Sequence, residues 1–155
     1  MPLPTSGSPA PPFELVSDQG RAMRLADLKG RAVVLFFYPK DDTPGCTVEA
    51  CAFRDDYQAY DQAGAVIIGV SPDSVASHVK FKEKFHLPFP LLADVGHKVA
   101  DAYGVWGEKH SYGKTTMGIR RTTFLIGKDG RILRVFENVK PNGHSEEILE
   151  ALGTK

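Results

Sequence analysis

The sequence predicts a single α/β domain, residues 1–155, in which helices pack on a sheet with parallel strands at its centre. Two continuous apolar runs, 32–38 and 65–70, are short and rich in β-branched and aromatic residues. Such runs are typical of strands that are buried on both faces. Each run is followed by a segment whose apolar residues recur at helical spacing, which favours alternating strands and helices.

The N-terminal part of the chain predicts an extended arm and a hairpin. Residues 1–12 are rich in Pro, Ser and Gly, which is typical of an extended lead-in. Strands are predicted over 13–16 and 23–25, and the turn-forming residues 17–20 join them. Residues 26–30 then form a loop or a single turn before the first apolar run.

The segment after the first apolar run predicts a loop and then a helix. Pro39 has no N–H to donate to a sheet, so the strand is expected to end before it. Thr43 followed by Pro44 is typical of a helix start, with Thr43 as the N-cap residue and Pro44 at the first helical position. The helix is expected to run to about Gln62 and to end at Gly64. Its aromatic residues at helical spacing are expected to pack against the sheet: Phe53, Tyr57 and Tyr60.

A second helix is predicted after the run 65–70. Residues 71–74 favour a helix start at that point. The apolar residues of this helix are Val75, Val79 and Phe85. Its lysines are expected to face water: Lys80, Lys82 and Lys84. Residues 91–92 then predict a short strand, and 97–103 predict a short helix.

The C-terminal part predicts a long loop, two strands and a closing helix. Residues 104–118 are rich in glycine and polar side chains, and we expect a loop there of the length that tends to be functional or mobile. Strands are predicted over 119–126 and 131–136, joined across the Asp-Gly turn signal in 128–130. Residues 143–152 predict the last helix. Its apolar residues share one face: Ile148, Leu149 and Leu152.

Composition argues against several classes of function. The chain has 19 basic and 19 acidic residues, so its formal net charge is zero. Proteins that bind nucleic acid or anionic membranes normally have a basic excess, so we expect neither partner. No apolar run approaches the ~20 residues of a membrane span, and the N-terminal residues do not resemble a secretory signal. We therefore expect a cytoplasmic protein, and in a reducing compartment two cysteines at helical spacing are more typical of catalysis than of a structural bridge.

The two cysteines, Cys46 and Cys51, lie just past the loop that follows the first apolar run. Cys46 falls in the first turn of the predicted helix, where unpaired N–H groups and the positive end of the helix dipole favour an anion. The thiolate is the nucleophilic form of cysteine. A helix N-terminus together with a nearby cation can lower a thiol pKa from about 8.5 to roughly 6, which makes the thiolate the majority form. The position therefore predicts a reactive cysteine.

Cys51 follows five residues later. In an intact helix this spacing places the two side chains about 140° apart around the axis, with Cα atoms roughly 8–9 Å apart. A disulfide needs Cα atoms closer than about 7 Å. The two cysteines can therefore pair only if the first turns of the helix unwind. This geometry predicts a switch, in which Cys46 reacts first and local unfolding then brings Cys51 to it.

Two other interpretations of the cysteines need no chemistry at Cys46. Most cytosolic cysteines are small buried hydrophobes, but the Thr-Pro-Gly residues before Cys46 and its place at a helix start favour a reactive role. A zinc site needs four ligands with short spacings between pairs. The sequence has no second cysteine pair and its five histidines are scattered, so no metal is expected.

These residues resemble a known family. The pattern Pro39-x-x-x-Thr43-x-x-Cys46 is similar to the active-site signature of peroxiredoxins. Residues 43–51 resemble the bacterioferritin comigratory protein (PrxQ) branch, in which a resolving cysteine lies five residues after the peroxidatic one. The similarity extends over most of the chain, through the segments 34–39, 69–73, 103–109 and 118–126.

The resemblance implies a thioredoxin-like fold, with a central mixed sheet flanked by helices and an N-terminal β-hairpin. It implies a thioredoxin-dependent peroxidase that reduces hydrogen peroxide and organic hydroperoxides. Cys46 would become a sulfenic acid, and Cys51 would then form an intramolecular disulfide with it. No metal or other cofactor is implied. The resemblance also suggests a monomer.

The resemblance assigns roles to further residues near Cys46. Peroxiredoxins place an arginine three residues before the Phe of the strand that here contains Phe124, which selects Arg121. Arg121 and the Thr43 hydroxyl would stabilise the thiolate and bind the peroxide, and Pro39 would shield the thiolate from bulk water. Glu49, one turn past Cys46, is expected to help hold the folded helix.

Two other functions use the same cysteines. A thiol–disulfide oxidoreductase that acts on proteins typically has a Cys-x-x-Cys motif, whereas here four residues separate Cys46 from Cys51. A non-enzymatic redox sensor would change shape on oxidation and signal to a partner. Its residues could be the same, so only turnover distinguishes the sensor from the enzyme.

Overall fold

The computed structural model describes residues 3–111 and 113–153. Their strands are β1 (Glu14–Ser17), β2 (Ala22–Arg24), β3 (Ala32–Phe37), β4 (Ala65–Ser71), β5 (Leu91–Ala93), β6 (Trp106–Ser111), β7 (Lys114–Ile119), β8 (Thr122–Ile126) and β9 (Ile132–Phe136). Their helices are η1 (Leu25–Leu28, 3-10), α1 (Pro44–Asp55), α2 (Tyr57–Gln62), α3 (Val75–Phe85), α4 (Lys98–Ala102) and α5 (His144–Ala151). None of these helices is long and apolar enough to cross a membrane.

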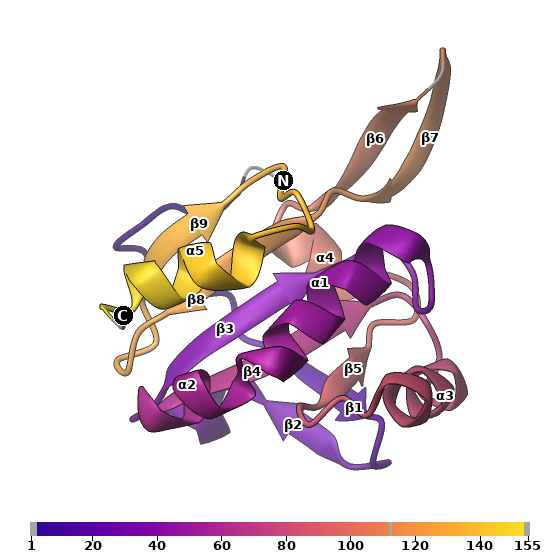
Figure 1. Ribbon diagram of the computed structural model, residues 1–155. Coiled ribbons are helices and arrows are strands. Elements are labelled where there is room, and N and C mark those ends of the chain that lie inside the picture. Colours follow the sequence, from indigo (N-terminus) through magenta and orange to yellow (C-terminus); the bar gives the residue numbers. More distant parts are fainter. Residues whose placement is uncertain (1–2, 112, 154–155) are drawn as a thin grey trace.

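Seven strands form one mixed sheet in the order β2-β1-β5-β4-β3-β8-β9 (Figure 1). β3 and β5 both run parallel to β4 at the centre of the sheet, as the two apolar runs predict. β8 pairs antiparallel with β3 and β9 antiparallel with β8, which extends the sheet on one side. The N-terminal hairpin of β1 and β2 joins the other side through β5. The predicted mixed sheet and N-terminal hairpin are both confirmed.

The buried strand β3 separates two apolar cores. Val34 and Phe36 point to the face covered by α1, α2, α3 and α5, and they pack with Cys46 and Phe53. The alternate residues of β3 point to the opposite face, where α4 and residues of the N-terminal segment cover them. All six residues of β3 are buried. The strand therefore fixes the start of the loop that leads to Cys46.

The predicted helix over 44–62 is two helices. α1 ends at Asp55, Asp56 takes a non-helical conformation (φ −96°, ψ 8°), and α2 follows. The break moves Tyr57 out of the aromatic stripe, so Tyr57 is 37% exposed while Phe53 and Tyr60 are fully buried. Contacts with α5 accompany the break: the Asp56 carboxylate accepts a hydrogen bond from the Ser145 hydroxyl, and the Tyr60 hydroxyl donates to the Ser145 carbonyl.

The prediction of a long loop over 104–118 is wrong. β6 and β7 form an antiparallel hairpin that projects from the rest of the molecule (Figure 1). Among its described residues, only those at its base, Trp106 and Ile119, join a core. The other described residues of the hairpin lie outside both cores and are largely polar, which is why its composition resembles a loop. At its base Trp106 stacks on the His97 ring, with ring centroids 3.7 Å apart. Cross-strand pairing, rather than burial, therefore explains these two strands.

The strand predicted over 119–126 also divides. β7 ends at Ile119 and β8 begins at Thr122, so Arg120 and Arg121 lie in the connection between two separate sheets. This connection leads from the hairpin into the main sheet, so the regular alternation of side chains along a strand does not apply to the two arginines.

The buried residues of α3 are not the apolar residues that its sequence pattern displays. His78 and Phe81 are buried, whereas Val75, Val79 and Phe85 are only partly covered. Among the lysines, Lys80 and Lys84 are exposed as expected. The Lys82 ammonium instead lies 2.8 Å from the Asp18 carboxylate and ties α3 to the N-terminal hairpin.

Candidate active site

Cys46 lies in the first turn of α1, as the sequence predicts. Thr43 has the extended conformation of an N-cap residue (φ −95°, ψ 156°), and Pro44 begins the helix. Cys46 is a free thiol and its side chain is almost completely buried. A buried thiol at a helix N-terminus lies where backbone N–H groups favour a negative charge.

Arg121 is the cation that contacts Cys46. Its Nη2 donates to the Cys46 Sγ over 3.3 Å, and its Nη1 donates to the Glu49 Oε1 over 2.7 Å. The sheet explains why residues 75 positions apart meet. Thr122, the first residue of β8, pairs with Phe37, the last residue of β3, so the segment before β8 adjoins the loop after β3.

Arg120 has a different contact. Its Nη2 donates to the Gly104 carbonyl, 2.8 Å away, and its guanidinium lies over Gly107 of the hairpin. The structure thus brings Arg121 to Cys46 and holds Arg120 against the base of the hairpin. Residue type alone offered no way to separate these neighbours, and the family resemblance supplied the signal.

Thr43 and Pro39 lie in the loop between β3 and α1, and both are half-buried. The Thr43 hydroxyl does not cap the helix. It donates to the Lys40 carbonyl over 2.9 Å, which closes the loop on itself. The Thr43 carbonyl accepts the first helical hydrogen bond, from the Thr47 amide at 2.9 Å. Thr43 is therefore the N-cap residue by position, without the side-chain bond that its residue type predicts.

Cys51 lies five residues along the same helix and is also a free thiol. It is half-buried, and burial raises the pKa of its thiol, against the opposing effect of Arg54. α1 is continuous from Pro44 to Asp55, so both cysteines occupy one intact helix. Helix geometry then keeps their Cα atoms roughly 8–9 Å apart, too far for a disulfide.

Glu49 is buried beside Arg121. The sequence suggested only that it helps to hold the folded helix, and its burial was not expected. Its side chain is 1% exposed, and burial raises its pKa from the ordinary 4.5 to about 7, even though Arg121 favours the charged form. Oε2 has no hydrogen-bond partner among the described residues. A glutamate at the i+3 position from Cys46 was visible in the sequence, but its burial depends on α5, which is distant in the chain.

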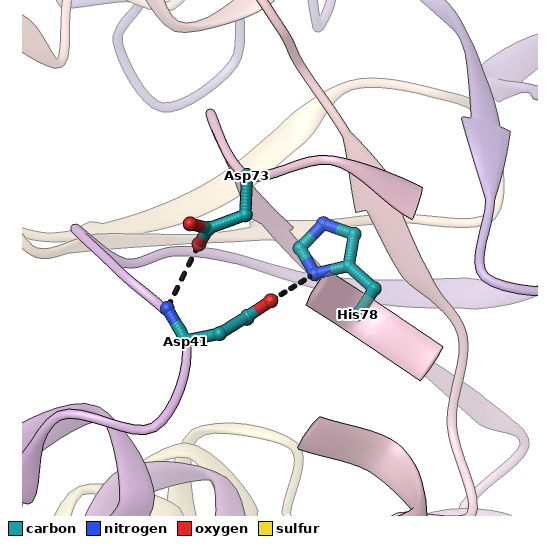
Figure 2. Close-up of side chains that lie close together, drawn as sticks. All are labelled: Asp41, Asp73 and His78. Carbon is teal, nitrogen blue, oxygen red and sulfur yellow. Dashed lines mark hydrogen bonds and ion pairs between the residues drawn. The ribbon is translucent and has the colours of Figure 1, made fainter. Parts of the chain in front are cut away.

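A second polar cluster holds the loop before Cys46, and sequence analysis missed it. It comprises Asp41 in the loop, Asp73 after β4 and His78 on α3 (Figure 2). The Asp41 carboxylate accepts hydrogen bonds from the Tyr38 hydroxyl at 2.6 Å and the Ser77 hydroxyl at 2.8 Å. Its Oδ2 also lies 2.7 Å from the His78 Nδ1.

The hydrogen bonds of this cluster explain its composition. His78 Nε2 lies 2.9 Å from the Leu92 carbonyl, which can only accept a hydrogen bond. Its Nδ1 faces the Asp41 carboxylate, which is also an acceptor. Both ring nitrogens therefore donate, as they do in an imidazolium. The Asp73 Oδ2 accepts from the Asp41 amide at 2.8 Å and the Ser71 hydroxyl at 2.6 Å. The polar atoms of Asp41, Asp73 and His78 that face one another are thus hydrogen-bonded within the cluster. We interpret the cluster as an anchor that holds the loop before Cys46.

Comparison with known proteins agrees with this arrangement. Residues 6–135 match the model of the AhpC/TSA family. Peroxiredoxin Bcp of Bacillus subtilis is 53% identical over 146 residues, covering 94% of this chain and 93% of that protein. Peroxiredoxin Bcp of Escherichia coli is 43% identical over 147 residues, covering 95% of this chain and 94% of that protein.

Solved structures show the same fold. The bacterioferritin comigratory protein of Xanthomonas campestris, studied for its alkyl peroxide reduction activity, superposes with a TM-score of 0.86 at 40% identity, over 91% of this chain and 90% of that one. A mutant of PrxQ from Xylella fastidiosa superposes with a TM-score of 0.91 at 34% identity, over 99% of this chain and 97% of that one.

The fold and the site together define a thioredoxin-fold protein with a cysteine buried at a helix N-terminus and bonded to an arginine. That description is the expected one for a thiol peroxidase. This chain belongs to the AhpC/TSA family and is a peroxiredoxin similar to the Bcp (PrxQ) proteins, which makes it a peroxidase among the oxidoreductases.

Proposed function

We propose that this peroxiredoxin reduces hydrogen peroxide and organic hydroperoxides at Cys46 and is regenerated by thioredoxin. The observation that supports this most directly is the 3.3 Å hydrogen bond from Arg121 Nη2 to the buried Cys46 Sγ at the start of α1. The guanidinium and the helix N-terminus both favour the thiolate, which is the form that attacks peroxides.

In the first step the Cys46 thiolate attacks one oxygen of the hydroperoxide. The O–O bond breaks, the sulfur becomes a sulfenic acid, and the other oxygen leaves as water or an alcohol after it takes up a proton. Negative charge develops on the leaving oxygen, so a cation fixed beside it lowers the barrier. Arg121 is placed for this role. The Thr43 hydroxyl would orient the peroxide, and Pro39 would keep bulk water from the thiolate.

In the second step Cys51 attacks the sulfenic acid sulfur of Cys46, and water leaves as the disulfide forms. Because intact α1 keeps the two residues too far apart, its first turns must unwind before this bond can form. The disulfide would be exposed in the unwound segment and readily opened by a dithiol. We assign thioredoxin as that dithiol, acting on a cytoplasmic, monomeric protein of one domain that needs no metal or other cofactor.

The test is the consumption of hydrogen peroxide over many turnovers in the presence of thioredoxin, thioredoxin reductase and NADPH. We expect sustained turnover by the wild type, with a Cys46–Cys51 disulfide detected by mass spectrometry under non-reducing conditions. Consumption that stops after about one equivalent with every dithiol tried would favour the redox-sensor alternative. Turnover with a glutaredoxin system but not with thioredoxin would contradict the assigned reductant alone.

Replacing Arg121 by methionine is expected to lower kcat/KM for hydrogen peroxide by about 10²–10³-fold, the usual effect of removing one donor to a developing negative charge. Arg120→Met is the matched control, because that guanidinium donates to the Gly104 carbonyl and not to sulfur. We expect the control to stay within a few fold of the wild type. Equal losses in the two variants, measured by stopped-flow kinetics, would contradict a specific role for Arg121.

A further inference from the structure

Glu49 is enclosed by the groups that also surround the reactive sulfur. It lies on α1 one turn after Cys46, its side chain is 1% exposed, and its Oε1 accepts a hydrogen bond from Arg121 at 2.7 Å. The other oxygen, Oε2, has no partner among the described residues. An ionised carboxylate left partly unpaired in an apolar interior is much less favourable than a neutral carboxyl group.

The elements packed against Glu49 supply little compensation for a charge. From α5, His144 places its Nε2 4.0 Å from Oε2. The His144 Nδ1 lies 2.9 Å from the Glu147 carboxylate and therefore donates to it, which leaves Nε2 to accept from the Thr123 hydroxyl at 2.8 Å. Burial lowers the pKa of His144, in keeping with a neutral ring. His144 thus offers Glu49 neither a charge nor a proton donor.

Among the described residues, Arg121 is the cation whose charge acts on Glu49. The same guanidinium donates to the Cys46 sulfur. Two acids, the Cys46 thiol and the Glu49 carboxyl, therefore share this guanidinium, and both residues are 1% exposed. The charge of Lys109 also acts on Cys46, whereas Arg121 is the cation that acts on Glu49. A negative charge on Glu49 is therefore the less well compensated of the two, because its Oε2 has no partner among the described residues. Because Cys46 must be a thiolate to react, the proton belongs on Glu49.

We propose that Glu49 is a positioning residue that holds a proton in the folded, reduced site and releases it to solvent when α1 unwinds to join Cys46 to Cys51. This inference rests on the disulfide step of the proposed function. The neutral carboxyl leaves the positive charge of Arg121 to the thiolate and to the peroxide. Unwinding removes Glu49 from its apolar surroundings, and the solvated carboxyl then ionises.

The proton balance of the cycle follows. Reduction of the disulfide breaks the bond between the two sulfurs and takes up two electrons and two protons from the reducing dithiol. One proton stays on the Cys51 thiol, and the other is released because Cys46 is left as a thiolate. Glu49 takes up one proton as α1 refolds around it, which balances the one released. Burial raises the pKa of Glu49 from 4.5 to about 7, so Glu49 binds this proton within that range of pH. Below about 4.5 Glu49 is protonated in both states, and above about 7 it is ionised in both.

The sign of the effect on the folded site is then fixed. A group whose pKa is raised by folding stabilises the folded form fully below its unfolded pKa, and that stabilisation is lost as the pH rises through the folded pKa. The contribution of Glu49 therefore favours the intact, reduced α1 in acid. Through Glu49, a rise from pH 5 to pH 7.5 favours unwinding and the disulfide.

The experiment measures the equilibrium between the dithiol and disulfide forms of the full chain against a dithiothreitol redox buffer from pH 5 to 8. Glu49→Gln removes the titrating group but keeps its shape. Glu146→Gln removes an exposed carboxyl on α5 and serves as the matched control. His144 and Glu147 are present in all three proteins, so their titration cancels in the comparison.

We expect the equilibrium constant for reduction of the wild type, divided by that of Glu49→Gln, to fall as the pH rises, and the same for Glu146→Gln divided by Glu49→Gln. The fall in this ratio approaches tenfold per pH unit between about 4.5 and about 7, which corresponds to one proton, and it vanishes at higher pH. Equal pH dependence in the wild type and Glu49→Gln would overturn the proposal. No disulfide in the oxidised wild type would overturn the two-cysteine cycle as well, so the two failures are distinguishable.

A second measurement keeps the test independent of how well Glu49→Gln folds. Infrared difference spectra of the wild type, reduced minus oxidised at pH 5.5, are expected to contain the carbonyl band of one protonated carboxyl group. Selective ¹³C labelling of glutamate side chains should shift this band. A reduced protein with no such band would show that Glu49 holds no proton, whatever its structural role.

Discussion

Cys46→Ser is expected to abolish hydroperoxide reduction, leaving only the background reaction of peroxide with buffer and reductant. A serine hydroxyl is not ionised near neutral pH, and oxygen cannot accept an oxygen atom as sulfur does. The fold should survive the change, because the Arg121 guanidinium that donates to the sulfur can donate to the hydroxyl at the same place. Peroxide consumption by the purified variant measures the effect, and circular dichroism checks its fold.

Cys51→Ser is the matched comparison, since it alters the other cysteine of the same helix. It should consume about one equivalent of peroxide and then stop, with one added oxygen atom on Cys46 detected by mass spectrometry. The contrast between no turnover and one turnover separates attack on peroxide from resolution. Multiple turnovers by Cys46→Ser would place the reactive thiol elsewhere and contradict the mechanism.

The elements that the sequence predicts well are those whose signals are local. The buried strands β3 and β4 follow from unbroken apolar runs, and α1 follows from Thr43 and Pro44 at its start. The place of Cys46 in the first turn needed only this helix start. The approach of Arg121 to Cys46 needed the register of β8 on β3, which no local pattern gives, so there the family resemblance was decisive.

The wrong predictions concern features that an element's own residues do not reveal. β6 and β7 stabilise each other by cross-strand pairing, largely outside the cores, so they lack the apolar alternation that identifies a strand. The break at Asp56 goes with hydrogen bonds to α5, about ninety positions along the chain. The burial of Glu49 likewise depends on α5. In these last two cases tertiary contacts override the local preference of the chain.

The cluster that anchors the active-site loop likewise depends on contacts between segments that are distant in the chain. Asp41 belongs to a polar run that resembles an exposed loop in the sequence, yet it is 7% exposed and accepts hydrogen bonds from the Tyr38 and Ser77 hydroxyls. It also contacts the His78 ring (Figure 2). His78 sits on α3 at a position whose neighbours suggested an apolar face. Only the packing of α3 against the loop brings the two together.

Asp41→Asn is expected to lower the free energy of unfolding by about 3–5 kcal/mol, the range for breaking a buried ion pair by changing one partner. The amide has one acceptor oxygen, so its NH₂ group must face a donor from Tyr38, Ser77 or His78. Asp42→Asn is the matched control. Asp42 forms an exposed pair with Lys84, and such pairs contribute at most about 1 kcal/mol. Urea denaturation of both variants measures the difference.

Asp41→Asn should also lower the reactivity of Cys46, because the loop that contains Asp41 positions Thr43 and the start of α1. The Asp41 amide also donates to the Asp73 carboxylate, so a displaced side chain loosens the backbone on both sides of the loop. We therefore expect Asp41→Asn to slow the reaction of Cys46 with hydrogen peroxide even under conditions where the variant is fully folded. Stopped-flow kinetics well below the urea midpoint test this. A variant that is destabilised but reacts at the wild-type rate would show that the anchor supports the fold without shaping the peroxide site.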